Sequence, residues 1–354
     1  MPRALIANRI VFRSQPSDFS TLISLQPNMR MPQLSTGECM YNSQSGSAYD
    51  NHKVKSFYIG KKDLDAILSD ITAYAEQKAV EPIQKVIFRS NELPEFAMRK
   101  KHPSHQEITE YPTEVGMYLG ENIAIEKYDV FAKFQAESNN NMLVIGGEQD
   151  VAEKVAIYAT LSAMDAHKDH SASFYFLNFM KMSDPLQKMP ETYMPSGIPF
   201  DVKFASKSAD VITLLSEIKE IMNQRKADEN AENHNIYLSV YAFQLARMFD
   251  RGGRRGEDVS EAGQLLDEIL KYGPLVGIYT ILQVDNLVNL ARISANLQLF
   301  QHKVALQMEE NDSMKVMGTG AASKLFIMNR PSSKFRCYYC NKSMNIVKKF
   351  KPYK

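Results

Sequence analysis

Apolar and polar positions along most of the chain alternate in the manner of strands and helices that follow one another. Short apolar runs predict strands, and apolar positions three to four residues apart predict helices. The predicted strands are residues 115–119, 142–146, 173–179, 202–205, 235–241, 277–284, 302–308 and 323–329, and the predicted helices are 151–166, 208–226 and 260–272. This alternation predicts an α/β fold, a mostly parallel sheet with helices on both faces.

The first hundred residues follow a different pattern. Residues 61–77 have apolar side chains at helical spacing and predict an amphipathic helix. Residues 86–88 predict a short strand, and the proline-flanked stretch 94–112 predicts an irregular linker. These segments are therefore expected to connect to the α/β region that follows.

Residues 142–154 have the order of a phosphate-binding loop. The apolar run 142–145 predicts a buried strand, Gly146 and Gly147 predict a turn, and helical spacing begins at Val151. A strand, a glycine turn and a helix form the setting in which P-loop proteins bind nucleotide phosphates. The sequence therefore predicts the scaffold of a nucleotide-driven motor.

The residues that carry the chemistry of such a loop are missing. A working loop ends in Gly, Lys and Ser or Thr, which bind the phosphates and Mg²⁺. Val151, Ala152 and Glu153 hold these three positions, and Glu148 and Asp150 add negative charge. We interpret the segment as a degenerate P-loop with no catalytic residue and no nucleotide of its own. It consists of Gly146, Gly147, Glu148, Gln149, Asp150, Val151, Ala152 and Glu153.

A second strand of such a motor ends in two acidic residues, one assisting Mg²⁺ and one polarising the attacking water. The candidate strand is residues 235–241, and Tyr241 and Ala242 stand where the acidic pair belongs. A phenol and a methyl group neither bind Mg²⁺ nor accept a proton at neutral pH. The two losses together predict a module without ATPase activity.

Two segments that lie far apart in the chain have similar sequences. Residues 8–18 can be laid over residues 302–312, and Ile23 and Met317 continue the match. In each copy a basic residue leads a short apolar strand, a polar turn follows, and an aspartate begins the next segment. The repeat indicates that the tail of one module begins the chain and the tail of a second module ends it. The alternative is chance similarity between two strand-and-turn segments.

Composition limits the class of protein without choosing a ligand. The 354 residues suffice for about two domains, and 44% hydrophobic with 23% charged residues is typical of globular proteins. A formal charge of +1 imposes no overall field toward nucleic acid or membrane. No apolar run approaches the ~20 residues of a membrane span, and three cysteines do not make a disulfide scaffold. We therefore expect a cytoplasmic protein without a membrane span.

Several segments together resemble FtsK/SpoIIIE DNA translocases. Residues 9–12 (Arg-Ile-Val-Phe) and 37–41 (Gly-Glu-Cys-Met-Tyr) are similar to the Arg-Ile-Ala-Phe and Gly-Asp-Met-Leu-Tyr strands that close that family's motor core. Residues 272–283 resemble the family's Gly-Ile-His segment and the strand after it, which ends near a glutamine. Residues 348–353 resemble the Lys-Phe-Arg-Pro-Tyr ending of proteins with tandem FtsK-like domains. Ser20 departs from the family, which has arginine in that turn.

The resemblance covers nearly the whole chain in order, and it implies a RecA-like P-loop NTPase fold. It further implies a ring homo-oligomer, ATP and Mg²⁺ bound in a neighbouring active FtsK-like module, and duplex DNA in a central pore. It divides the chain into the tail of a preceding motor module (1–60), a connecting helix, strand and linker (61–112), and a degenerate RecA-type module (113–354). The degenerate module is then expected to act as a structural or regulatory layer along the DNA path.

A basic loop follows the second-motif strand. Arg251, Arg254 and Arg255 lie among glycines, and such a loop can wrap a phosphate backbone without reading its sequence. The resemblance implies a DNA-facing loop at about this point, so these three arginines are the candidate DNA contacts. The alternative is a solvated surface loop.

One pair of cysteines and one pair of histidines have spacings that suggest metal ligands. Cys337 and Cys340 have the spacing of half a zinc site, but no second pair stands near them. His167 and His170 suit the C-terminal end of the helix that they follow. No metal site is therefore predicted. Residues 334–354, basic and aromatic, suit either nucleic acid or an edge strand, and the resemblance favours the strand.

Three other interpretations stay open. The chain is alternatively a degenerate module of a type VII-like protein secretion motor, which binds peptides instead of DNA. It is alternatively an active NTPase with an atypical loop, in which Lys154 stands one helical turn late. The third is a remnant of a decayed gene that starts inside a domain.

Overall fold

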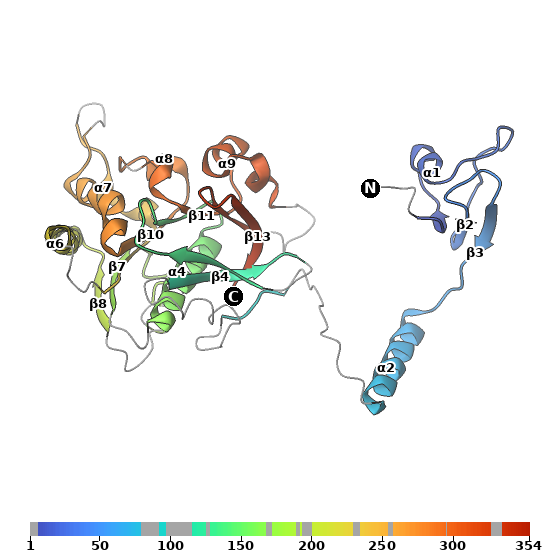
Figure 1. Cartoon of the computed structure of the whole chain (residues 1–354), viewed down its shortest axis with the longest axis horizontal. Coiled ribbons are helices and arrows are strands. Elements are labelled where there is room, and N and C mark those ends of the chain that lie inside the picture. The colour runs from blue at the N-terminus through green and yellow to red at the C-terminus, as the bar shows by residue number, and fades with distance from the viewer. Residues whose placement is uncertain are drawn as a thin grey trace. The chain divides into compact units, whose positions relative to one another are not determined.

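The protein is described by a computed structural model, and its chain divides into two compact units, Met1–Lys85 and Val86–Lys354 (Figure 1). The structure describes residues 6–78, 92–96, 115–124, 128–167, 172–188, 192, 200–228, 234–253, 258–294, 296–326 and 335–354. The predicted strand 86–88 and most of the predicted linker 94–112 lie outside the described residues. Each unit is considered by itself.

The N-terminal unit is a three-stranded antiparallel sheet with two helices. Its strands β1 (Arg9–Phe12), β2 (Glu38–Asn42) and β3 (Asn51–Lys55) pair in chain order, and its helices are α1 (Pro16–Leu22) and α2 (Lys61–Gln77). Val11, Phe19, Ile23, Leu34 and Met40 form its small core. The predicted helix 61–77 is confirmed, and all its residues are exposed to solvent in the described part of the chain.

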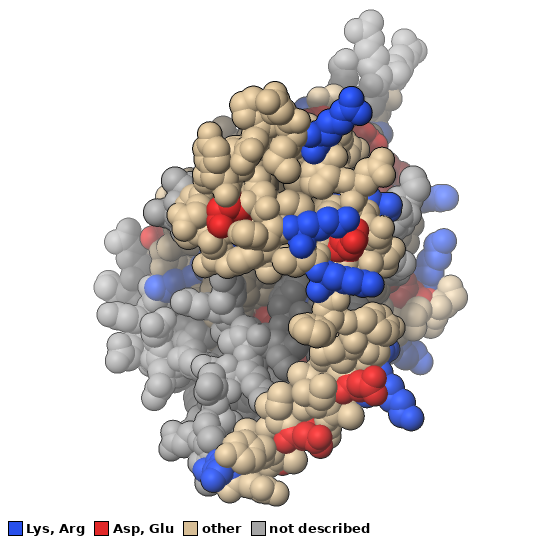
Figure 2. All heavy atoms as spheres, turned by 90° about the vertical axis from the view of Figure 1, so that its right-hand side faces the viewer, with Lys and Arg blue, Asp and Glu red and all other residues tan. Residues whose placement is uncertain are grey.

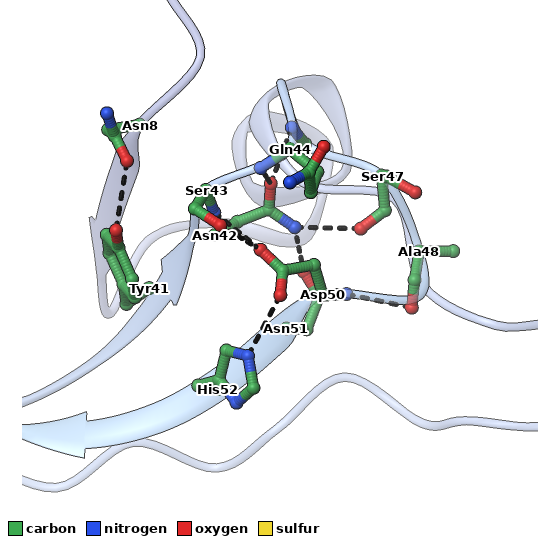
Figure 3. A network of polar contacts seen from close by, with 11 residues as sticks. Asn8, Tyr41, Asn42, Ser43, Gln44, Ser47, Ala48, Asp50, Asn51 and His52 are labelled. Carbon is green, nitrogen blue, oxygen red and sulfur yellow. Dashed lines mark hydrogen bonds and ion pairs between the residues drawn. The ribbon is translucent and has the colours of Figure 1, made fainter.

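A buried asparagine organises the turn between β2 and β3 (Figure 3). The amide group of Asn42 donates to Ser47 O and Asn51 Oδ1 (2.7 Å each), and Asn42 Oδ1 accepts from the N–H of Gly46 (2.7 Å). Ser43 donates to Asp50 through its hydroxyl (2.6 Å) and its N–H (2.8 Å) and so lowers the pKa of Asp50 to about 2. The hairpin is therefore fixed by side-chain bonds to its own backbone.

Replacing Asn42 with alanine is expected to destabilise this hairpin by about 2 kcal/mol, because the N–H of Gly46 loses its buried acceptor. Hydrogen exchange of the Gly46 amide measures the loss. Asn8→Ala is the matched control: its side chain is exposed and accepts one bond from Tyr41 (2.9 Å), so its effect should stay below about 0.5 kcal/mol. Equal protection in Asn42→Ala and the parent chain would contradict the expectation.

The C-terminal unit is built on one ten-stranded sheet of order β5-β4-β13-β12-β11-β6-β10-β9-β7-β8. Its six strands from β11 to β8 are parallel, and β12, β13, β4 and β5 continue the sheet antiparallel. The strands are β4 (Val115–Asn122), β5 (Asp129–Phe134), β6 (Met142–Ile145), β7 (Ala172–Asn178), β8 (Phe200–Ala205), β9 (Ile236–Tyr241), β10 (Ile278–Val284), β11 (His302–Ala305), β12 (Cys337–Asn341) and β13 (Ile346–Pro352). The predicted α/β class with a mostly parallel sheet is confirmed.

Helices cover both faces of this sheet (Figure 1). They are α4 (Gln149–Ala166), α6 (Ser208–Ala227), α7 (Glu261–Tyr272), α8 (Leu287–Leu290) and α9 (Glu310–Met317). One core cluster joins α4 to one face, and a second joins α6, α7 and α9 to the other. Helix α4 is buried nearly all round because β4 also packs on it, with the N–H of Tyr118 donating to Ser162 Oγ (2.8 Å). Among the described residues, no helix has the length and apolarity needed to cross a bilayer.

The predicted elements agree with most of this sheet, and they differ from it at residues 323–329, at the end of β11 and at β5. The predicted strand 323–329 is wrong where it is described, because Gly320–Lys324 forms a 3₁₀ helix. The side chain of Gln307 donates to Ser323 O and accepts from the N–H of Phe326 (2.7 Å each). These bonds occupy backbone groups that a strand would pair. The predicted strand 302–308 ends early, at Ala305, and β5 was not predicted.

The two segments of the sequence repeat have the same topology. In the first, β1 is followed by α1, β2 and β3; in the second, β11 is followed by α9, β12 and β13. Each triplet of strands pairs antiparallel in chain order. Asp18 and Asp312 both lie in the first turn of the helix. The similarity between residues 8–18 and 302–312 therefore reflects a shared strand–helix–hairpin unit.

Candidate functional site

The candidate site lies at the carboxyl end of β6. The loop Gly146–Glu148 leaves this strand between the ends of its parallel neighbours β10 and β11 and leads directly into α4. Ligands of open α/β sheets bind in the crevice at the carboxyl ends of the strands. The predicted strand, glycine turn and helix are therefore confirmed, at the edge where a nucleotide would bind.

The backbone amides of this loop are bonded within the protein. The N–H of Gly146 donates to Val284 O (3.3 Å), and the N–H of Gly147 donates to Gln307 O (3.2 Å). The N–H groups of Gln149, Val151 and Ala152 donate to carbonyls of the loop itself, at 3.0 to 3.1 Å. A phosphate cradle needs such amides unpaired and directed at the ligand. Five amides of the loop and of the first turn of α4 are thus bonded within the protein.

Leu306, just after β11, lies directly against Gly146. An ideal Cβ added to Gly146 would lie 2.6 Å from Leu306 Cβ, and the φ of Gly146 is +148°. A side chain at this position would therefore meet both a steric and a conformational barrier. Gly147 has no comparable restriction, since the nearest atom to its Cβ position is Gln307 O at 3.9 Å.

A methyl group, Ala152, and a carboxyl group, Glu153, stand where a P-loop has its cation and its hydroxyl. Glu153 is fully buried in the first turns of α4, and its Oε1 accepts from Gln149 Nε2 (2.7 Å). Its Oε2 has no donor among the described residues. Burial, together with the nearby carboxylates of Asp184 and Asp150, raises the pKa of Glu153 to about 7, against the lowering effect of the Gln149 bond.

A cavity of about 330 Å³ opens beside these groups and is lined by Gln149, Asp150, Glu153, Lys181, Asp184 and Leu245. It has three carboxyl groups and one ammonium, which is the wrong balance for a triphosphate. Lys154, the residue considered for an atypical loop, does not line this cavity. The arrangement favours holding a proton or a cation near Glu153 over holding an anion.

The second-motif strand is confirmed as β9, and Tyr241 and Ala242 stand at its end as predicted. Tyr241 is buried and points to α4, where its hydroxyl donates to Thr160 Oγ1 (3.1 Å). Ala242 has a left-handed φ of 53°, and its N–H donates to Gln283 Oε1 (2.6 Å). Gln283 comes from β10, which lies between β6 and β9. The neutral amide of Gln283 and the N–H of Ala242 therefore bond to each other where a working motor has its Mg²⁺ ligands.

The basic loop is only partly described, since Arg254 and Arg255 lie outside the described residues. The guanidinium of Arg251 donates to Ala291 O (3.0 Å) and Ile293 O (3.4 Å), and backbone bonds between Gly252 and Asp258 close the base of the loop. Arg251 therefore anchors the loop, which leaves Arg254 and Arg255 as the stronger candidates for phosphate contact.

The cysteine and histidine pairs have structural surroundings where they are described. Cys337 lies in the core on the α4 side of the sheet and Cys340 in the core on the other side, so they cannot ligate one ion together. Nε2 of buried His167 bonds the hydroxyl of Tyr237 (2.7 Å), while His170 is outside the described residues. No group of metal-binding residues is found among the described ones.

Two residues of the site were not predicted from the sequence. Lys181 and Asp184 reach the cavity from the segment after β7, about thirty residues beyond the loop in sequence. Only the position of this segment at the carboxyl end of a parallel strand could have pointed to them.

Comparison with known proteins gives structural neighbours only, since no family model and no curated protein matches the chain. EssC (ATPases 2 and 3) from Geobacillus thermodenitrificans matches with a TM-score of 0.53 and 12% identity, over 100% of this chain and 62% of EssC. EccC (ATPases 2 and 3) from Thermomonospora curvata, in complex with a signal sequence peptide, matches with 0.51 and 11%, over 92% of this chain and 54% of EccC. The pCW3 conjugation coupling protein TcpA matches with 0.52 and 9%, over 100% and 95%.

The chain has the fold of FtsK/SpoIIIE-type ATPase modules. The resemblance seen in the sequence is thereby confirmed for the fold, which is what identities of 9 to 12% show. The chain spans little more than half the length of the EccC and EssC structures.

Proposed function

We propose that the C-terminal unit is a nucleotide-free FtsK-like module that serves as a structural or regulatory layer of an ATP-driven translocase. The observation that carries this proposal is the state of the loop after β6. Its amides are bonded to Val284 O and Gln307 O, and Ala152 and Glu153 stand where an ammonium and a hydroxyl are needed. Such a role needs the fold and its surfaces but not the phosphate chemistry.

ATP and Mg²⁺ would then be bound by a neighbouring active module. A carboxyl group at position 153 repels the terminal phosphates when ionised, and Tyr241 and Ala242 supply no ligand for Mg²⁺. We therefore propose no cofactor for this module and no catalytic residue in it.

Residues 1–60 are proposed to be the closing part of a preceding motor module, joined by residues 61–112 to the degenerate module (113–354). In support, β1 leaves the large apolar side chains of Ile10 and Phe12 in solvent, and the connecting helix α2 leaves those of Leu68 and Ile71 in solvent. Apolar surface of this kind marks contact sites. The proposed partner is an active FtsK-like module of the same or another chain, within a ring of copies.

Duplex DNA is the proposed substrate of the assembly. The chain as a whole has a formal charge of only +1, and on the face drawn in Figure 2 lysine and arginine are interspersed with aspartate and glutamate. Contact with DNA would therefore be local, through Arg254 and Arg255 on the loop that Arg251 anchors.

A binding titration of the full chain with duplex DNA tests this function. Arg254→Ala/Arg255→Ala is expected to weaken binding about tenfold or more and to reduce the salt slope by about 2, since two phosphate contacts are lost. Arg13→Ala/Arg30→Ala, which removes two exposed arginines of the N-terminal unit, is the control and should leave the slope unchanged. Binding that both pairs affect equally would contradict a DNA-facing loop.

Protein secretion is the second candidate function, favoured by the similarity to EssC and to EccC, whose structure holds a signal sequence peptide. Peptide binding by the chain without salt-sensitive DNA binding would favour it. ATP hydrolysis by the purified chain that Lys154→Ala abolishes would instead establish an active NTPase and overturn the nucleotide-free module.

A further inference from the structure

A second cavity lies at the amino ends of the parallel strands β6 and β11, whereas the loop after β6 lies at their carboxyl ends. It has a volume of about 610 Å³ and is lined by residues that precede β6 and β11, by α9, and by the turn between β12 and β13. Parallel strands β6 and β11 begin at this edge and carry the degenerate loop at their other end. The cavity therefore belongs to neither the nucleotide position nor the basic loop.

Donors dominate the walls of this cavity. Three lysines line it, Lys303, Lys315 and Lys342, and none of the described residues that line it is acidic. The other polar lining residues are asparagines, glutamines and serines, whose amide and hydroxyl groups can donate. The carboxylate of Asp312, 3.7 Å from Lys315 Nζ, is not part of the lining. Three positive charges thus share one cavity without a carboxylate on its walls.

Lys303 is buried, unlike the other two lysines of the cavity. It is 5% exposed, and its ammonium donates to a neutral partner, the carbonyl of Phe300 (2.5 Å). Burial, with the nearby Lys342 as a further cause, lowers the pKa of Lys303. A buried ammonium close to a second one is unfavourable unless an anion compensates both. Lys303 is also the basic residue that leads the second copy of the sequence repeat.

We propose that this cavity binds a ligand through a phosphate group, held by Lys303, Lys315 and Lys342. A phosphate offers several anionic oxygens, which suits walls made of ammonium and amide donors. The volume is within the ~300–1,000 Å³ of ordinary ligand sites and exceeds what one phosphate fills, so the phosphate belongs to a larger molecule. The inference goes beyond the proposed function and does not depend on it.

Calorimetric titration of the full chain with inorganic pyrophosphate, in phosphate-free buffer of low salt, tests the site. Saturable binding is expected. Lys315→Ala/Lys342→Ala should weaken it at least tenfold, because two charged contacts are lost. Both lysines are exposed, so this variant should fold. Lys61→Ala/Lys62→Ala removes two exposed lysines of α2 and is the matched control, with unchanged binding.

Lys303→Met provides an independent variant, because methionine is unbranched and only one atom shorter than lysine but carries no charge. Its binding should also fall at least tenfold, with folding verified by circular dichroism. Absence of pyrophosphate binding by the parent chain would overturn the proposal. So would equal affinity of the parent chain and Lys315→Ala/Lys342→Ala.

Competition against pyrophosphate distinguishes the sources of the phosphate. A single-stranded oligonucleotide with and without a 5′-phosphate is added to the complex. Displacement by both forms identifies backbone phosphates of nucleic acid, and displacement by the phosphorylated form alone identifies a phosphate monoester. Displacement by neither assigns the site to a small free ligand. The variant Arg254→Ala/Arg255→Ala should bind pyrophosphate as the parent chain does. Unchanged binding would show that the cavity and the proposed DNA-binding loop are independent sites.

Discussion

Replacing Gly146 with alanine is expected to lower the free energy of unfolding of the C-terminal unit by about 3 kcal/mol. The new methyl group would lie 2.6 Å from Leu306 Cβ and 3.0 Å from Leu306 Cα, and the latter is backbone that cannot move aside cheaply. The residue would also have to adopt a φ of +148°, which is unfavourable for any side chain. Overpacking and backbone strain each contribute roughly 1–3 kcal/mol.

Gly147→Ala is the matched control, one residue along the same loop. Its added methyl group would be in ordinary contact with Gln307 O at 3.9 Å, and its φ is not in the left-handed region. We expect a change below about 1 kcal/mol. Urea unfolding followed by circular dichroism measures both variants. Similar midpoints for Gly146→Ala and Gly147→Ala would show that Leu306 does not restrict the residue at position 146.

Replacing Glu153 with glutamine is expected to stabilise the protein above pH 7 by about 2 kcal/mol. Burial raises the pKa of this carboxyl group from 4.5 to about 7, a difference worth about 3 kcal/mol, which solvent in the adjoining cavity reduces. The amide of glutamine is neutral at every pH and can still bond Gln149. It therefore removes the penalty for ionisation without leaving a gap.

The stability difference between Glu153→Gln and the parent chain is expected to grow as the pH rises. Below pH 4.5 the carboxyl group is protonated in both the folded and the unfolded chain, so glutamine and glutamic acid should be equivalent. Above pH 4.5 only the unfolded chain releases the proton, and the parent protein loses stability until the folded group ionises near pH 7. Thermal unfolding of both chains between pH 5 and 8 tests this. A constant difference over that range would contradict a buried carboxyl group with a raised pKa.

The arrangement of elements could be predicted from the sequence because its signals are local. The apolar run of β6, the glycines after it and the spacing in α4 are each sufficient to identify their element. The strand expected at 323–329 failed because a distant side chain, Gln307, satisfies the backbone there. Strand β5 was missed although its buried and half-buried residues alternate with the period of two that is typical of a strand.

The chemistry of the loop could be predicted only in part. The residue types at Ala152 and Glu153 already indicate that phosphate chemistry is absent, since a methyl and a carboxyl group replace an ammonium and a hydroxyl. The bonds from Gly146 and Gly147 to the ends of β10 and β11 depend on the pairing of strands far apart in sequence. The same is true of Asp184, which meets Glu153 only through the packing of β7.

Strand β1 has a consequence for how the chain behaves outside its assembly. In the C-terminal unit the equivalent strand β11 is flanked on its far side by β6, whereas β1 is the outermost strand of its own sheet. An outermost strand with outward-facing Ile10 and Phe12 is a template on which another polypeptide can add a strand. When the protein is purified without a partner that covers β1, it is expected to self-associate through this strand.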